Sequence, residues 1–275
     1  MNKNILISVV MITYGHEKYI KKAIESVLNQ KLDYKLELII ANDCSPDNTD
    51  NIVTKIIKTH RMSSSIKYFR HNINKGMMSN FSWALNQAKG SYVAICEGDD
   101  YWTDEEKLNK QISFLAQNSV FSFCFHSVKV INSSKDYKYH FSIPKKSVLT
   151  IKHIILKHYI PTCSVVFRKE FLPDTFPQWF EESIVGDIPI EIMLASKGPI
   201  KYLNQNMAVY RKHENGITLN KGHQLKARHG FINLYKNLSL YFNGQYWLLL
   251  NFMVLKNYLG ITKDYVTNRL KIDKL

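Results

Sequence analysis

Short apolar runs alternate with amphipathic stretches through the first hundred residues. Four apolar runs predict strands, at residues 5–13, 36–41, 66–70 and 91–96. Three stretches between them carry apolar side chains at helical spacing and predict helices, at residues 17–30, 47–60 and 77–88. This alternation is typical of a mostly parallel, Rossmann-like sheet. We therefore expect an α/β fold with helices on both faces of the sheet.

The pattern becomes less regular after Trp102. Helices are expected at residues 104–118, 150–158 and 187–196, and strands at 120–131, 164–168 and 200–210. Residues 133–147 are polar and aromatic, which favours a surface loop near a substrate. Residues 222–275 predict two or more helices. Because no repeat or Gly/Ser linker interrupts the chain, this helical region is expected to extend one domain.

Composition and charge narrow the class of protein. The 275 residues are 45% hydrophobic, which is enough for a sizeable core. Residues 1–110 hold 15 basic and 13 acidic residues, whereas residues 111–275 hold 22 and 10. The excess of basic over acidic residues in residues 111–275 favours an anionic partner such as a phosphorylated carrier, an acidic glycan, a lipid headgroup or nucleic acid. A lysine-rich genome is the alternative explanation.

The cysteines and the apolar runs bear on the cellular compartment. Four cysteines stand singly without a CxxC pair, so neither a zinc ribbon nor a disulfide framework is predicted. No run approaches the roughly 20 apolar residues that a membrane-spanning helix needs. The apolar run at residues 5–13 is followed directly by the predicted helix at residues 17–30 and shows no small-residue cleavage pattern. It is therefore interpreted as a first strand and not as a signal peptide. We expect a cytoplasmic protein with reduced thiols.

A cluster of carboxylates follows the fourth predicted strand, in the sequence Glu97-Gly98-Asp99-Asp100. Such close carboxylates repel one another unless a cation or a basic partner neutralises them. Oxygen ligands at the carboxyl end of a strand suit Mg²⁺ or Mn²⁺. A solvated acidic turn is the alternative, but the buried strand before the cluster favours a metal site.

Other chemistry is less well supported by the sequence. Asp43 ends the second strand, where a carboxylate can bind a nucleobase or a ribose, or can merely shape the turn before a helix capped by Asp47. No G-x-G-x-x-G and no P-loop motif is present, so nicotinamide-binding and P-loop enzymes are disfavoured. The histidines form no HExxH motif, which disfavours a zinc hydrolase.

Several segments in sequence order carry a family resemblance. They are ISVVMITYGHEKYIKKAIESVLNQ, LELIIANDCSPDNT and HNINKGMMSNFSWALNQAKGSYVAICEGDDYW, followed later by VGDIPI and YRKHENGIT. Together they resemble the family 2 glycosyltransferases, inverting nucleotide-sugar enzymes with the GT-A fold. The resemblance is close over residues 5–110. It implies a GT-A domain at residues 1–220, with a nucleotide-sugar-binding half (1–110) and an acceptor half (111–220), and a helical extension at residues 221–275.

The resemblance also implies the residues of the donor site. Thr13 and Tyr14 end the first strand, where Tyr14 would pack against the nucleobase. Asp43 would hydrogen-bond the nucleobase. Asn74 and Gly76 belong to an N-x-G element that borders the nucleotide. The expected donor is a UDP-sugar.

Metal binding and catalysis are assigned by the same resemblance. Asp99 and Asp100 match the metal motif, one contacting the sugar or ribose and the other a Mn²⁺ or Mg²⁺ ion on the diphosphate. Asp187 matches the general base, although its alternative is a helix cap. His213 is a candidate for diphosphate or metal contact, with Arg211 beside it at the donor site.

The sequence departs from the family pattern at two places near these residues. Glu97 stands where many relatives have Asp, and Gly15-His16 replaces the Asn commonly found after the tyrosine. Neither departure removes a proposed catalytic group.

The expected activity is inverting transfer of a hexose to a glycan or lipid-linked acceptor in surface polysaccharide biosynthesis. A nucleotidyltransferase is an alternative, but such enzymes usually carry a glycine-rich basic loop after the first strand. A basic binding module is another, because residues 215–275 hold 9 basic and 2 acidic residues. No nucleic-acid recognition motif accompanies them, so nucleic acid is not expected as a partner. The basic region also suits peripheral contact with an anionic membrane, and the alternative is a helix pair that covers the sheet.

Overall fold

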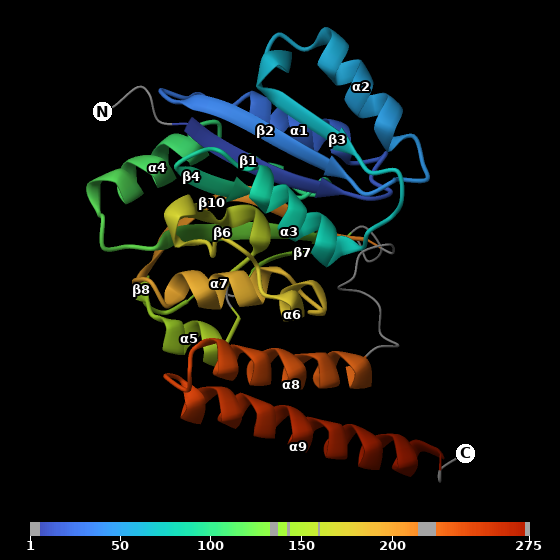
Figure 1. The fold of residues 1–275 in the computed structure, drawn as a ribbon. Coiled ribbons are helices and arrows are strands. Elements are labelled where there is room, and N and C mark those ends of the chain that lie inside the picture. The colour runs from blue at the N-terminus through green and yellow to red at the C-terminus, as the bar shows by residue number, and fades with distance from the viewer. Residues whose placement is uncertain (1–5, 133–136, 142–143, 159, 214–223, 273–275) are drawn as a thin grey trace.

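The chain folds around one large sheet, seen in the ribbon of a computed structural model (Figure 1). The structure describes residues 6–132, 137–141, 144–158, 160–213 and 224–272. In these residues ten strands join the sheet: β1 (Leu6–Thr13), β2 (Lys35–Asn42), β3 (Ile66–Arg70), β4 (Tyr92–Ile95), β5 (Tyr101–Trp102), β6 (Phe123–Asn132), β7 (Tyr137–His140), β8 (Val148–Leu149), β9 (Val166–Arg168) and β10 (Ile200–Lys212). The main path runs β3-β2-β1-β4-β9-β6-β10-β5.

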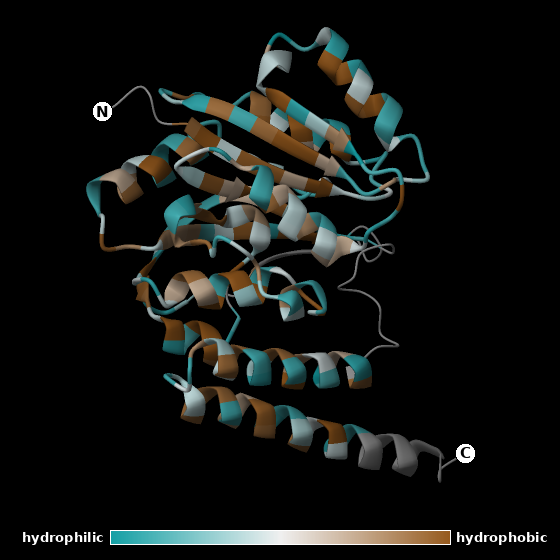
Figure 2. Ribbon diagram, viewed as in Figure 1, coloured by the Kyte–Doolittle hydropathy of each residue, from teal (hydrophilic) through white to brown (hydrophobic). Residues whose placement is uncertain are grey.

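The first half of the sheet is parallel, as expected from the strand–helix alternation. β1 pairs with β2 and β4, and β2 pairs with β3, all in parallel register. Successive residues of β1 point to opposite faces, so that Val10 enters one core and Val9 enters the other. Both faces of β1 are therefore buried, which explains its nearly continuous run of hydrophobic positions (Figure 2).

The second half of the sheet is mixed. β9 lies antiparallel between β4 and β6, whereas β6 and β10 are parallel to each other. The short strands β5 and β8 pair antiparallel with β10. The long strand β10 thereby ends beside the turn that follows β4.

Helices cover both faces, as the sequence predicts. They are α1 (Ile20–Leu28), α2 (Thr49–Thr59), α3 (Met77–Gln87), α4 (Lys107–Gln117), α5 (Ile151–Leu156), α6 (Gln178–Glu181), α7 (Asp187–Ala195), α8 (Gln224–Tyr241) and α9 (Trp247–Ile272). Helices α1, α2 and α4 bury their apolar side chains in one core, and α3, α5 and α7 in the other. Helices α8 and α9 add to the second core from outside. None of the helices in the described residues is long and apolar enough to cross a membrane.

The structure corrects three local expectations. The predicted surface loop at residues 133–147 contains β7, which pairs antiparallel with β6. β10 continues to Lys212, two residues beyond the predicted end, because its last residues still pair with β6. Helices α1 and α2 begin at Ile20 and Thr49, later than predicted, since the residues before them form turns at the carboxyl edge of the sheet.

A charged side chain lies in the core behind the carboxylate cluster. Lys107 is fully buried, donates to Oε1 of Gln111 at 2.7 Å and lies 4.0 Å from the centre of the Trp102 ring. Burial lowers the pKa of Lys107 to about 8. Gln111 in turn donates to the carbonyl of Ser164 at 2.8 Å, and the Trp102 indole donates to the carbonyl of Cys163 at 2.9 Å. This polar group therefore ties α4 to residues 163–164.

We expect Lys107→Ala to lower the free energy of unfolding by about 3 kcal/mol, because it leaves a cavity and removes the partner of Gln111. Lys107→Met keeps most of the volume and should cost less than about 1.5 kcal/mol. The control is Lys110→Ala on the exposed side of the same helix, with a loss below about 1 kcal/mol. Urea unfolding measures all three. Equal losses for Lys107→Ala and Lys110→Ala would contradict the structural role.

Candidate active site

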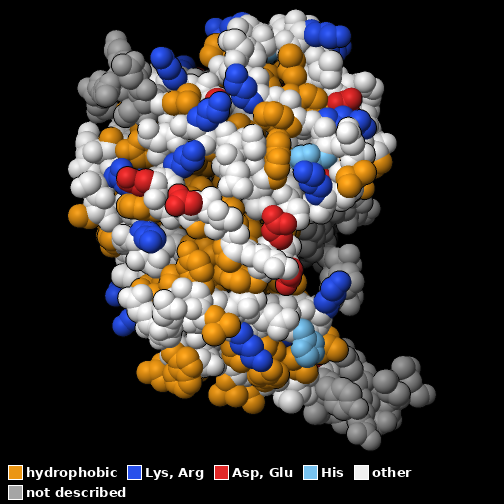
Figure 3. Space-filling view, viewed as in Figure 1, with side chains coloured by type: hydrophobic (Ala, Val, Ile, Leu, Met, Phe, Trp, Pro, Cys, Tyr) orange, Lys and Arg blue, Asp and Glu red, His pale blue; other side chains and the backbone are white. Residues whose placement is uncertain are grey.

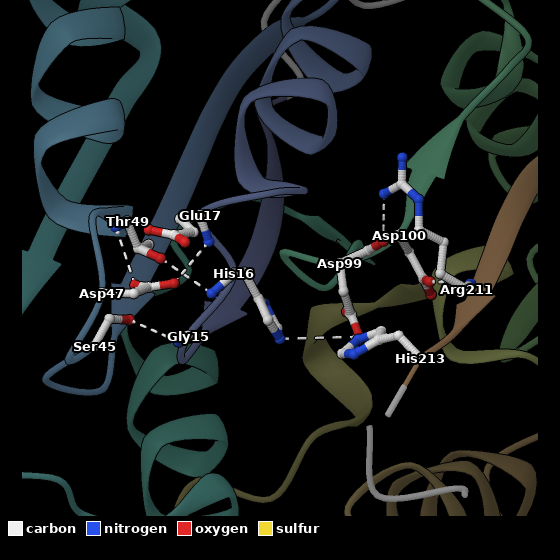
Figure 4. A network of polar contacts seen from close by, with 10 residues as sticks. All are labelled: Gly15, His16, Glu17, Ser45, Asp47, Thr49, Asp99, Asp100, Arg211 and His213. Carbon is white, nitrogen blue, oxygen red and sulfur yellow. Dashed lines mark hydrogen bonds and ion pairs between the residues drawn. The ribbon is translucent and has the colours of Figure 1, made fainter. Parts of the chain in front are cut away.

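The loop after β1 is anchored to the turn between β2 and α2. Three consecutive backbone N–H groups donate to side chains of that turn: Gly15 to Ser45 (3.1 Å), His16 to Thr49 (3.0 Å) and Glu17 to Asp47 (2.9 Å) (Figure 4). The backbone of His16 is therefore held in place, and its imidazole points toward the turn after β4.

That second turn depends on a glycine. The Gly98 N–H donates to the carbonyl of Ile12 at 3.0 Å, which brings the turn against the end of β1. A Cβ atom at Gly98 would lie 2.7 Å from Oγ1 of Thr13 and 2.9 Å from Nδ1 of His16. Only glycine permits this approach without a shift, so the residue between Glu97 and Asp99 sets the position of the following carboxylates.

Asp99 lies between two histidines from distant parts of the chain. Its Oδ2 is 3.0 Å from Nε2 of His213 and 3.9 Å from Nε2 of His16 (Figure 4). One ligand atom of each of these three residues lies within 4.8 Å of the others. One carboxylate and two imidazoles at this spacing form a candidate centre for a divalent cation.

Electrostatics favour the ligand form of Asp99 and of His16. Burial works to raise the pKa of Asp99, but the hydrogen bond from His213 and the two imidazoles hold it below the usual value. Burial lowers the pKa of His16, so its imidazole is neutral at neutral pH and keeps a lone pair for a cation.

Asp100 faces inward and connects the turn to β10. It is almost fully buried, its Oδ1 accepts the backbone N–H of Arg211 at 2.8 Å, and Cys163 lies beside it. Burial and the charge of Asp99 raise its pKa well above the usual value. The Arg211 guanidinium donates to the carbonyl of Asp99 and lies 4.4 Å from the centre of the Tyr101 ring. Asp100 and Arg211 therefore lock the acidic turn to β10.

A second cluster lies at the end of β2. The buried carboxylate of Asp43 accepts the backbone N–H groups of Lys75 at 2.8 Å and Gly76 at 3.0 Å. Oδ1 of Asn74 also accepts from Gly76, at 2.9 Å, and the φ of +87° at Gly76 suits glycine. Tyr14 directly follows the last residue of β1, and 49% of its surface is exposed. Asp43 thus shapes the 74–76 turn, and its contact with a nucleobase stays a prediction.

Asp187 begins α7 and lines a cleft of about 130 Å³ that Glu97, Thr162 and Tyr210 also line. Its Oδ1 accepts the backbone N–H of Ile188 at 2.9 Å. Its Oδ2 accepts the Thr162 hydroxyl at 3.4 Å, a long contact. Gly186 is the N-cap of α7 and Asp187 is its first residue, so the Asp187 carboxylate binds one free N–H group of the helix without occupying the cap position. The same side chain lines the cleft.

Burial and mutual repulsion perturb the carboxylates around this cleft. Burial raises the pKa of Asp187. Burial, Asp99, Asp100 and Asp187 together raise the pKa of Glu97 well above its usual value. One helical turn further on, burial and Asp187 do the same to Glu191. Perturbed carboxylates in a cleft are typical of functional sites.

The structure brings the predicted residues into three groups. Asp99, Asp100, Arg211 and His213 form the first group, with Thr13 packed beneath it against Gly98. The others are the cluster around Asp43 and the cleft at Asp187. Sequence reasoning missed His16 as a member of the first group. The available signal was its position, since Gly15-His16 is where the chain departs from the family pattern.

Comparisons with solved structures define the fold class. Staphylococcus aureus TarS, residues 1–349 with UDP-GlcNAc, aligns with a TM-score of 0.65 and 21% identity over 85% of this chain and 66% of that one. The Pyrobaculum calidifontis mannosyltransferase PcManGT, with GDP-Man and Mn²⁺, aligns with a TM-score of 0.64 and 15% identity over 96% and 76% of the two chains. The expected GT-A fold is confirmed.

Sequence comparison identifies the family. The profile of glycosyl transferase family 2 matches residues 8–173, and the chain belongs to this family. The Escherichia coli protein WfaP, a UDP-Glc:alpha-D-GlcNAc-diphosphoundecaprenol beta-1,3-glucosyltransferase, is 32% identical over 80% of this chain and 82% of its own length. An uncharacterized Mycobacterium tuberculosis protein is 34% identical over 76% of this chain, and the chain spans 60% of the length of that relative.

We expect Gly98→Ala to reduce glycosyl transfer on the order of 10- to 100-fold, because the added Cβ displaces Asp99 from the histidines. Steady-state kinetics test the loss, and thermal unfolding shows whether the fold persists. Unchanged transfer by a folded Gly98→Ala variant would contradict the proposed role of this close packing.

Proposed function

We propose that this protein transfers a hexose, with inversion, from a UDP-sugar to a hydroxyl group of a glycan or lipid-linked acceptor. The observation that carries the proposal is the arrangement of acidic groups at one edge of the sheet. Asp99 and two histidines form a candidate cation centre, and Glu97 connects that turn to the cleft in which Asp187 lies. A donor diphosphate and an acceptor hydroxyl require these two kinds of group.

The relatives support the choice of donor and acceptor. WfaP is named for UDP-Glc and for a diphosphoundecaprenol-linked acceptor, and TarS was solved with UDP-GlcNAc. We assign the present protein to surface polysaccharide assembly, such as that of capsule or lipopolysaccharide. The reaction is placed in the cytoplasm, where the free thiols of its cysteines persist. In this proposal residues 1–110 bind most of the donor, and residues 111–220 bind the acceptor and add Arg211 and His213 to the donor site.

The ligand atoms of Asp99, His16 and His213 fit a divalent cation. Asp99, His16 and His213 would hold it, and the two imidazole nitrogens favour Mn²⁺ over Mg²⁺, which prefers oxygen ligands. PcManGT was solved with Mn²⁺. When bound, the cation would neutralise the charge that develops on the leaving diphosphate. Asp100 acts in this proposal as a positioning residue that holds Arg211 rather than as the main metal ligand.

Asp187 serves as the general base. Its carboxylate would accept the proton of the acceptor hydroxyl while that oxygen attacks the anomeric carbon and the bond to the diphosphate breaks. Attack from the side opposite to the leaving group inverts the anomeric centre. Burial raises the pKa of Asp187, which brings its basicity closer to that required near neutral pH.

The nucleoside would lie at the cluster around Asp43. The exposed ring of Tyr14 is free to stack on a base, and Asp43 and Asn74 hold the turn that would border it. Thr13 would instead support the adjoining cation centre, because it packs against Gly98 beneath Asp99.

Calorimetry tests the cation centre. We expect UDP to bind at least about tenfold more tightly with Mn²⁺ than without it, and Asp99→Asn or His213→Ala to remove that difference. The matched control is His229→Ala on the exposed face of α8, which should bind UDP like the wild type. If Mn²⁺ leaves UDP affinity unchanged in the wild type, the cation assignment is wrong. Release of pyrophosphate instead of UDP during turnover would favour a nucleotidyltransferase.

Asp187→Asn tests the general base. Transfer should fall by roughly 10²- to 10⁴-fold, while Mn²⁺-dependent UDP binding stays unchanged. Asp174→Asn, at an exposed position, is the control and should keep wild-type kinetics. Retention of transfer by Asp187→Asn would exclude the assignment.

The pH profile gives a second test of the same base. As the pH falls through the raised pKa of Asp187, the base becomes protonated, so kcat/KM should fall at a higher pH than for an ordinary aspartate. Glu97 and Glu191 also titrate beside Asp187 and broaden this limb. The limb should be absent from the residual activity of Asp187→Asn.

A further inference from the structure

The outermost helix exposes an apolar face. Helix α9 buries Leu250, Met253 and Val254 against the rest of the protein. Its other side carries large hydrophobic residues at intervals of four, three and four positions, which we call the α9 stripe: Leu248, Phe252, Leu255 and Leu259. All four are more than half exposed, and Leu248 is 79% exposed. This spacing places them on one face of the helix.

The stripe forms part of a larger hydrophobic surface. Figure 3 shows hydrophobic side chains gathered at the lower end of the molecule, over the turn between α8 and α9. Leu240, Tyr241 and Trp247 are the exposed residues around that turn. From Leu248 to Leu259 the stripe is roughly 17 Å long. An apolar patch of this kind on a polypeptide surface marks an interaction site.

The border of the stripe is basic. Lys256 and Lys263 are exposed, and each lies four residues after a member of the stripe, Phe252 and Leu259 respectively. Within residues 224–264 there are five basic residues and one acidic residue. The acidic residue, Asp264, accepts a hydrogen bond from Arg228 at 2.6 Å. The two helices therefore carry a surplus of positive charge, and Lys256 and Lys263 bring part of it beside the stripe.

Aromatic side chains border the same face. Trp247 is 56% exposed. The ammonium nitrogen of Lys236 lies 3.4 Å from the hydroxyl oxygen of Tyr258. Tryptophan and tyrosine have an apolar body and a polar tip, which suits the boundary between water and hydrocarbon. Exposed leucine and phenylalanine, lysine borders and aromatic residues together characterise a helix that lies in a membrane interface.

The charge distinguishes a lipid surface from a second copy of this chain. A two-fold pairing of α9 with α9 would bring the lysine borders of both copies together, which is unfavourable. An anionic phospholipid surface attracts the same borders while the stripe enters the region of the acyl chains. We propose that the α9 stripe docks this protein on an anionic phospholipid membrane, with α9 parallel to the membrane plane.

This docking would orient the catalytic edge. In Figure 1, α9 runs along the underside of the molecule toward the side at which β1 and β2 end. An acceptor carried by a membrane lipid would then approach the carboxyl edge of the sheet from below. That consequence rests on the proposed function, whereas the membrane contact itself rests only on the surface of α9.

Vesicle flotation tests the contact without donor or acceptor. We expect the wild type to float at low salt with phosphatidylcholine vesicles that contain phosphatidylglycerol. With vesicles of phosphatidylcholine alone, or at high salt, it should remain in the bottom fraction. Leu248→Ser/Leu255→Ser and Lys256→Glu/Lys263→Glu should each reduce the bound fraction about tenfold.

Matched controls separate the stripe from general changes of surface. Val120→Ser replaces a similarly exposed hydrophobic residue at another place, and Lys55→Glu/Lys58→Glu reverses the same number of charges on α2. Both should float like the wild type. Thermal unfolding shows whether each variant is folded, and calorimetry with UDP and Mn²⁺ reports separately on the proposed activity, so failure of docking and failure of that activity are distinguishable.

Two outcomes would overturn the proposal. Absence of wild-type flotation at low salt, or equal flotation of the stripe variants and the wild type, would exclude membrane docking through α9. A dimer seen by sedimentation that dissociates in Leu248→Ser/Leu255→Ser, without wild-type flotation, would assign the stripe to a second copy of the chain instead.

Discussion

The contact between Asp99 and His213 joins the two halves of the sheet at the site. Asp99 follows β4 in the parallel half, and His213 follows β10 in the mixed half, 114 positions later in the chain. The 3.0 Å contact between them is reinforced by the bond from the Arg211 backbone to Asp100. The position of the candidate cation centre therefore depends on the register of β10 and on the turn after β4. A shift of one residue in β10 would exchange the side chains on its two faces.

The same edge of the sheet separates carboxylates by their environment. Asp99 has histidine partners that hold its pKa low, so it stays ionised. Burial raises the pKa of Asp187, and burial together with neighbouring carboxylates raises the pKa values of Glu97 and Asp100. One stably ionised carboxylate suits a cation, and a carboxylate of raised pKa suits a proton acceptor. This contrast gives the site two chemical functions from one residue class.

The sequence predicts the regular parts well and the irregular parts poorly. The central strands and amphipathic helices are readable because burial imposes a period on hydrophobic residues. Lys107 and Gln111 show where this fails, since two polar residues occupy core positions of α4 and bind one another and the segment at Ser164. His16 lies near Asp99 only through long-range anchoring of its loop, which no local pattern encodes.

Behind the acidic turn, the polar core couples the two walls of the site. Lys107 and Gln111 hold Ser164, two residues after Thr162, whose hydroxyl contacts Asp187. Trp102, two residues after Asp100, holds Cys163 of the same segment. Both the turn that would carry the cation and the residue that would carry the base are thus tied to residues 162–164. Since a displacement of about 1 Å can cost 10²-fold in rate, a rigid segment at this place serves the chemistry as well as the stability of the fold.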